Sequence, residues 1–163
     1  LVTQSGVDAP RWLSAVGGLT HEAIATVYAE GGPALPLPML ALESGPAQFV
    51  FDRAHLGGPA GVFAFVVSAS EGDGQSIEQR VLAQAASLGW TLRPLKTVIE
   101  KRATFACLPG LQRPAIEVAD GLLACGDYVE GPYPATIEGA VRSAIAAVDR
   151  LKRPATRTAA KAT

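Results

Sequence analysis

The stretch that most constrains the fold runs from Ala119 to Asp149 and joins a short apolar segment to an alanine-rich helix. Leu122 to Cys125 is a strand candidate, and Gly126 and Asp127 form a turn directly behind it. After a crossing rich in proline and glycine, a helix is expected to begin near Thr136. A strand that ends in a carboxylate, followed by a helix with a small first turn, suits a polar cofactor at the edge of a parallel sheet.

The composition is that of a turn-rich globular chain. The 163 residues are 48% hydrophobic and 18% charged, which is enough apolar material for a domain with a core. The net charge of −1 gives no whole-molecule argument for binding nucleic acid or an anionic membrane. Cys107 and Cys125 are isolated in apolar strand candidates, so we expect buried, reduced thiols and a cytosolic compartment.

Neither a membrane-spanning helix nor a secretory signal is expected. The longest apolar run, Val62 to Val67, is far shorter than the roughly 18 apolar residues that a spanning helix needs. The N-terminus lacks the basic and apolar regions of a secretory signal. Because the chain begins with Leu1, we expect a fragment or a processed product.

The middle of the chain predicts a sheet. The strand candidates are Ile24 to Tyr28, Gln48 to Asp52, Gly61 to Ser70, Leu95 to Ile99 and Ala103 to Cys107. Gly61 to Ser70 is almost continuously apolar, which is typical of a strand covered on both faces. The prolines between Pro33 and Pro46 exclude a helix, so this apolar segment is predicted to be a loop or a sheet edge that covers apolar surface.

Two helices are predicted with distinct patterns. Ser76 to Leu88 has a helical apolar period, with Ser76 and Gln79 in capping-box spacing. The final helix carries an apolar stripe, with Glu138 and Arg142 as an i,i+4 pair on its other face. The segment before residue 19 gives only weak helix signals. The basic end of the chain is predicted to be solvated, with contact to anionic lipid or RNA as the alternative.

The Gly126–Asp127 turn has a functional and a purely structural interpretation. The Asp127 carboxylate is placed to accept hydrogen bonds from a sugar or ribityl hydroxyl, or to lie near a pyrophosphate; a simple turn is the alternative. Thr136 can cap the helix, while Gly139 at the third helical position supplies no carboxylate to reach back. We therefore expect free N–H groups to face a ligand, with space beside Gly139 and Ala140 for a planar ring.

The residues Gly126 to Ala144, GDYVEGPYPATIEGAVRSA, resemble the C-terminal flavin-binding signature of the FAD-dependent amine oxidase and phytoene desaturase superfamily. Within that group the chain looks closest to the squalene-associated FAD-dependent desaturases, now assigned as hydroxysqualene dehydroxylases of the hopanoid pathway. The strings that carry this narrower similarity are LPLPMLALESGPAQFVFDR (Leu35 to Arg53), GVFAFVVSASEG (Gly61 to Gly72) and VIEKRATFACLPGLQRP (Val98 to Pro114).

The resemblance implies FAD as cofactor. Gly126 and Asp127 would lie at the ribityl–pyrophosphate end, and Ala135, Thr136 and Ile137 under the isoalloxazine. It further implies a C30 isoprenoid alcohol in an apolar cavity built by the middle of the chain. The reaction would be reductive loss of the hydroxyl to give squalene and water. The alternatives are a carotenoid-type desaturase or a non-catalytic fragment that binds a lipid or a partner; no catalytic residue is assigned.

The chain departs from this superfamily in one large respect, because none of its glycine pairs has the GxGxxG spacing that holds the ADP half of FAD. We therefore expect the C-terminal portion of a longer enzyme, with a missing N-terminal FAD-binding half. The predicted fold is α/β, with α+β as the alternative. The predicted domains are a substrate-domain portion (1–118), the last strand and helix of the FAD domain (119–151) and a basic tail (152–163). A cytoplasmic location is expected, and peripheral contact with the inner membrane is a further possibility under the same resemblance.

Other polar residues suggest little chemistry. His21 and His55 lack ligands at metal spacing, so no metal site is expected. His55, beside Asp52 and Arg53, is either a general acid for hydroxyl departure or a loop histidine. The serines lack a G-x-S-x-G context, which argues against a hydrolase.

Overall fold

The computed structural model describes residues 2–152, which combine helices and strands. The helices are η1 (Val2–Gln4), α1 (Pro10–Gly17), η2 (Ala54–Leu56), α2 (Gly74–Ser87) and α3 (Ile137–Lys152). The strands are β1 (His21–Glu30), β2 (Met39–Ala41), β3 (Phe49–Asp52), β4 (Val62–Val67), β5 (Arg93–Phe105), β6 (Glu117–Ala119) and β7 (Leu122–Leu123). The predicted mixed class is confirmed, and every strand pair with a defined register is antiparallel, which favours the α+β form. The predicted basic tail lies outside the described residues from residue 153 on.

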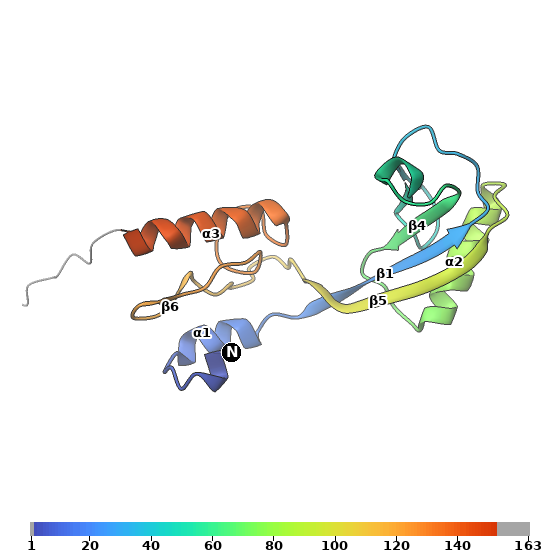
Figure 1. The fold of residues 1–163 in the computed structure, drawn as a ribbon. Helices are drawn as coiled ribbons and strands as arrows, with labels where there is room; N and C mark the ends of the chain where they lie inside the picture. The colour runs from blue at the N-terminus through green and yellow to red at the C-terminus, as the bar shows by residue number, and fades with distance from the viewer. Residues whose placement is uncertain (1, 153–163) are drawn as a thin grey trace, which may run out of the picture. The chain divides into compact units, whose positions relative to one another are not determined.

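The chain divides into two compact units. One is continuous, His21–Thr104, and is called here the sheet unit (Figure 1). The other, the helix unit, combines Leu1–Thr20 with Phe105–Thr163. The domain boundary predicted at residues 118 and 119 refers to the domains of a longer enzyme and stays a prediction.

The sheet unit is built on one sheet in the order β2-β3-β4-β1-β5. Its centre is fixed by pairing of Val27 with Phe65 and of Phe65 with Val50, all of which are fully buried. Side chains on a strand alternate between the faces of a sheet, so these residues share one face. The strands predicted around Ile24 to Tyr28 and Gln48 to Asp52 are confirmed.

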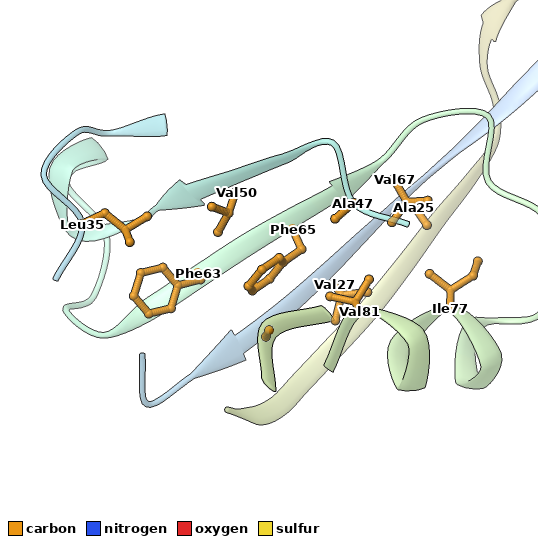
Figure 2. Close-up of a cluster of buried hydrophobic side chains, with 11 residues drawn as sticks. Ala25, Val27, Leu35, Ala47, Val50, Phe63, Phe65, Val67, Ile77 and Val81 are labelled. Atoms are coloured by element: carbon orange, nitrogen blue, oxygen red, sulfur yellow. The ribbon is translucent and has the colours of Figure 1, made fainter. Parts of the chain in front are cut away.

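Helix α2 covers this buried face and completes the core of the sheet unit (Figure 2). Ile77 and Val81 of α2 are fully buried against Phe65 and its neighbours. The predicted helix is confirmed, but it begins at Gly74 rather than Ser76. Its cap is Asp73, whose Oδ1 accepts the Ser76 N–H at 2.8 Å, and aspartate is among the favoured N-cap residues.

Strand β4, predicted to be covered on both faces, has helix α2 on one side, and on the other side Ala64 is buried as well. It lies between β1 and β3 with antiparallel pairing to each, and α2 covers only the side of Phe63 and Phe65. Val62 and Val66 on the other side are half-buried. A continuous apolar run therefore does not distinguish a strand that is buried on both faces from a strand whose second apolar face is only partly buried.

Strand β5 is one long strand, where the sequence predicted two. The charged residues Glu100, Lys101 and Arg102 were expected to interrupt it, but they are exposed along the edge of the sheet. Charged side chains are common on edge strands, where they discourage pairing with other chains. The residues before position 19 carry only weak helix signals, but the structure has helix α1 there. This helix begins with Pro10 in the first helical position.

The proline-rich segment behaves as predicted. Leu35 is buried in the core of the sheet unit, and β2 forms the outer strand of the sheet. Leu37 and Met39 in the same segment are exposed. The segment is therefore an edge and loop that covers apolar surface on one side only.

The helix unit contains the β6–β7 hairpin and α3, which is the orange-red helix in Figure 1. Its small core joins Ile116, Val129 and Ala147. The prediction of a parallel sheet before Asp127 is not met in residues 2–152, because β7 pairs antiparallel with β6. The strand is also shorter than predicted and ends at Leu123.

Replacement of Gln84 is expected to destabilise the sheet unit strongly. This buried side chain accepts the Ala47 N–H at 2.9 Å and donates to the carbonyls of Ala47 and Ser44. Gln84→Leu leaves buried main-chain groups unsatisfied, at a cost of about 2–4 kcal/mol in the free energy of unfolding. Urea denaturation measures the loss. Gln79→Leu, at an exposed position of the same helix, is the control and should change stability by less than about 0.5 kcal/mol.

Candidate functional site

The candidate site is the loop from Gly126 to Thr136, which crosses the first turn of α3. The structure brings the predicted residues of both ends together, because the Ala135 N–H donates to the Asp127 carbonyl oxygen at 3.3 Å. Ile137 is the first residue of α3 after Thr136, and its side chain is 86% exposed. The two ends of the loop therefore meet at Asp127 and Ala135, next to Gly126 on one side and to Thr136 and Ile137 on the other, and the roles of these residues at a flavin stay a prediction.

Ser143 of α3 anchors the start of this loop. Its hydroxyl oxygen accepts the Gly126 N–H at 2.9 Å and lies 3.0 Å from the Gly126 carbonyl oxygen and 2.7 Å from that of Ala140. The hydroxyl has one proton and so donates to only one of these two carbonyl oxygens at a time. Gly126 must lack a side chain, because a Cβ there would lie 2.5 Å from the Tyr128 ring. Ser143 is buried and was missed at the sequence level, where it resembles any small residue of an alanine-rich helix.

Thr136 caps α3, as predicted. Its hydroxyl accepts the Gly139 N–H at 3.0 Å and donates to the Tyr133 carbonyl at 2.7 Å, while its own carbonyl accepts the Ala140 N–H. The N–H groups of Gly139 and Ala140 are therefore already bonded to Thr136, although the sequence predicted free N–H groups facing a ligand. Among residues 2–152, the N–H groups of Ile137 and Glu138 have no acceptor, so they are the ones left at the positive end of the helix dipole.

The space beside Gly139 is not open to a planar ring, which corrects the prediction. A Cβ at Gly139 would lie only 2.2 Å from the Tyr133 carbonyl oxygen, so the loop itself fills this position. Tyr133 and Ala135 both have φ of 56°, a left-handed conformation that costs non-glycine residues energy. The loop thus lies tightly on the helix.

A cavity of about 190 Å³ lies between this loop and α3. Asp127, Glu130, Arg142 and Ser143 supply its polar lining. Drug-sized ligands need pockets of roughly 300–1,000 Å³, so the cavity admits only part of a dinucleotide. Arg142 is engaged by Glu138 at 2.5 Å and lies 5.1 Å from the centre of the Tyr133 ring. Asp127 has no side-chain partner among the described residues, which leaves its carboxylate available to a ligand.

The face of the sheet opposite α2, called here the open sheet face, is a second candidate site. Its members follow from the pairing register and the alternation of side chains. Two rows cross the strands: Met39, Phe51, Ala64 and Tyr28, and next to them Ala41, Phe49, Val66 and Thr26. Neither row contains a charged side chain. Within residues 21–104, α2 is the one α-helix, and it packs on the other face.

His55 is a structural histidine in this arrangement. Its Nε2 lies 2.9 Å from the Leu35 carbonyl oxygen, which only accepts hydrogen bonds, so Nε2 carries the proton. Asp52 is buried at 2% exposure and accepts the N–H groups of Leu35 and Ala54. Together these residues fix the proline-rich segment, and the loop-histidine alternative is favoured over the general acid.

The two cysteines differ from the expectation. Cys107 and Cys125 are exposed thiols, not buried ones, because the strands that were expected to cover them end before these residues. The described part of the chain contains no group of His, Cys, Asp and Glu side chains able to hold a metal ion. No helix in residues 2–152 has the length and apolar character needed to cross a bilayer.

Comparison with known proteins finds no family model that matches the chain and no curated protein that matches it significantly. The resemblance to flavin-dependent desaturases therefore rests on the sequence strings and stays a prediction.

Gly139→Ala is expected to displace the loop from α3. The added Cβ meets a main-chain carbonyl that cannot rotate away, so we expect a loss of about 1–3 kcal/mol in unfolding free energy. Gly17→Ala is the matched control in the same unit, since a Cβ there meets nothing within 4 Å. Chemical denaturation of both variants gives the comparison; equal stabilities would contradict the close approach of Tyr133.

Tyr128 is expected to remain neutral well into the alkaline range. Burial raises the pKa of its hydroxyl above the ordinary value of 10.0, and the charges of Cys125 and Asp127 raise it further. Because the folded state holds this proton more tightly, its contribution to stability is complete below the unfolded pKa and is lost as pH rises toward the folded pKa. Tyr128→Phe should remove the last component of tyrosinate absorbance in an alkaline titration and reduce the alkaline loss of stability.

Proposed function

We propose that this chain is the C-terminal portion of an FAD-dependent oxidoreductase that acts on an isoprenoid, with reductive dehydroxylation of hydroxysqualene to squalene as the reaction. The observation that carries the proposal is the clustering of Gly126 and Asp127 with Ala135 to Ile137 at the start of α3, in the segment that resembles a flavin-binding signature. Hydride donation is the chemistry that a reduced flavin supplies.

The geometry fits the flavin and ribityl half of FAD. The Asp127 carboxylate suits hydroxyl donors of a ribityl chain, and the open N–H groups of Ile137 and Glu138 suit the negative charge that a reduced flavin carries. Exposed Ile137 offers an apolar contact for a ring. The ADP half has no glycine-rich site in this sequence, so the cavity beside Asp127 accounts for only part of the cofactor.

The open sheet face supports an apolar substrate. Phe49 and Met39 are 37% and 45% exposed, and the rows around them offer only the hydroxyls of Thr26 and Tyr28 among hydrocarbon side chains. Burial of such surface against an isoprenoid is favourable by about 25 cal/mol per Å². Neighbouring exposed apolar side chains of this kind support a contact with an apolar ligand.

The apolar stripe of α3 supports the proposal that a further segment completes the helix unit. Ile137, Val141, Ile145, Val148 and Leu151 are each at least 47% exposed, with Leu151 at 65%. A helix of a globular protein normally turns such a stripe toward a core. A preceding FAD-binding half would bury it, and the proposal assigns that role to the missing portion.

The test is the full-length protein that contains this chain, purified with and without Asp127→Asn. The wild type is expected to bind FAD and absorb as a flavoprotein, and the variant to bind FAD about 10- to 100-fold more weakly, because a hydrogen bond to a charged group is lost. Asp120→Asn, at an exposed nearby position, is the control and should leave the affinity unchanged. Fluorescence titration with FAD measures each affinity.

The outcomes separate the candidate functions. A full-length protein without flavin that still binds isoprenoids tightly would contradict the oxidoreductase and leave a lipid-binding protein. With flavin present, anaerobic incubation of the reduced enzyme with hydroxysqualene should yield squalene. Desaturated products formed by the oxidised enzyme would instead identify a carotenoid-type desaturase.

A further inference from the structure

Arg113 is bonded to the loop that carries Asp127. Its Nη1 donates to the Val129 carbonyl oxygen at 2.7 Å, and its Nη2 donates to the Gly131 carbonyl oxygen. These acceptors lie 16 and 18 positions further along the chain. The planar guanidinium fork reaches the two carbonyls with separate N–H groups, an arrangement that the single ammonium of a lysine does not reproduce.

The segment that holds Arg113 is itself firmly fixed. The Pro114 carbonyl accepts the Glu130 N–H at 2.8 Å, and Pro114 is fully buried. The next two carbonyls, of Ala115 and Ile116, accept the Trp12 indole N–H at 2.9 Å and the Ala124 N–H at 2.8 Å. Arg113 therefore projects from a rigid support and is not a surface side chain that happens to touch a loop.

Asp127 lies between two anchors of the same loop. On one side Ser143 holds Gly126, one residue before Asp127, against α3. On the other side Arg113 holds Val129, two residues after it, and Val129 is 2% exposed. Because both neighbours are held by side chains from different parts of the unit, the backbone at Asp127, which lines the cavity, has little freedom to move.

We propose that Arg113 is a positioning residue of the flavin site, which acts on cofactor binding through Asp127. This inference rests on the proposed function, since it concerns the same site. Both Nη groups are used by loop carbonyls, and no carboxylate pairs with Arg113 among residues 2–152. The fork geometry, rather than the positive charge, is therefore the property that the site uses.

The experiment is a double-mutant cycle on FAD affinity in the full-length protein. Arg113→Lys keeps the charge and removes the fork, and is expected to weaken FAD binding about tenfold, as for the loss of one charge-assisted hydrogen bond at Asp127. In an Asp127→Asn background the same change should weaken binding less than about twofold, because the positioned carboxylate is already absent. Arg11→Lys, at an exposed position of α1, is the control and should have no effect in either background.

A purely structural role gives a different result. If Arg113 only stabilises the fold, Arg113→Lys weakens FAD binding by the same factor in both backgrounds, and this overturns the inference, as does an unchanged affinity. If Arg113→Lys does not fold, Arg113→Gln, which keeps an NH₂ donor for one carbonyl, serves in the same cycle. The proposed function fails separately, when the wild type binds no FAD or Asp127→Asn binds it normally; either result also overturns the role of Arg113.

Discussion

The arrangement of the helix unit depends on a missing side chain at position 139. The Tyr133 carbonyl occupies the place where a Cβ would stand, 2.2 Å away, so the loop can lie directly on the first turn of α3. This close approach lets Thr136 bridge the Tyr133 carbonyl and the Gly139 N–H with one hydroxyl. The same crossing places Tyr133 and Ala135 in a left-handed conformation, which costs energy for residues other than glycine.

Helices and caps that depend on neighbouring residues in the sequence could be predicted. Features that depend on contacts between distant segments could not. Helix α2 follows from its apolar period, and the Thr136 cap from the residue itself. The continuity of β5 through Glu100 to Arg102 depends on its place at the sheet edge, which no local pattern reveals. The side of β4 on which α2 packs has the same origin, because it depends on how the helix meets the sheet.

The candidate site divides in the same way. The resemblance assigned Gly126, Asp127 and Ala135 to Ile137 to one site, and the structure brings Asp127 and Ala135 into contact. The sequence did not predict Ser143 or Arg113, because a serine in a helix and an arginine before a proline gain their roles only from main-chain groups that fold against them. Nor did it predict that the loop closes over Gly139, since two non-glycine residues with positive φ are rare.

The division of the chain into units has a consequence for the order in which the protein folds. The sheet unit is continuous, whereas the helix unit needs both ends of the chain, as in the bond from Trp12 to the Ala115 carbonyl across 103 positions. Contacts so distant in sequence form slowly, and domains fold as their chain is completed. The indole N–H of Trp12 therefore meets its acceptor only after the whole sheet unit has been synthesised, so the helix unit is completed after the sheet unit.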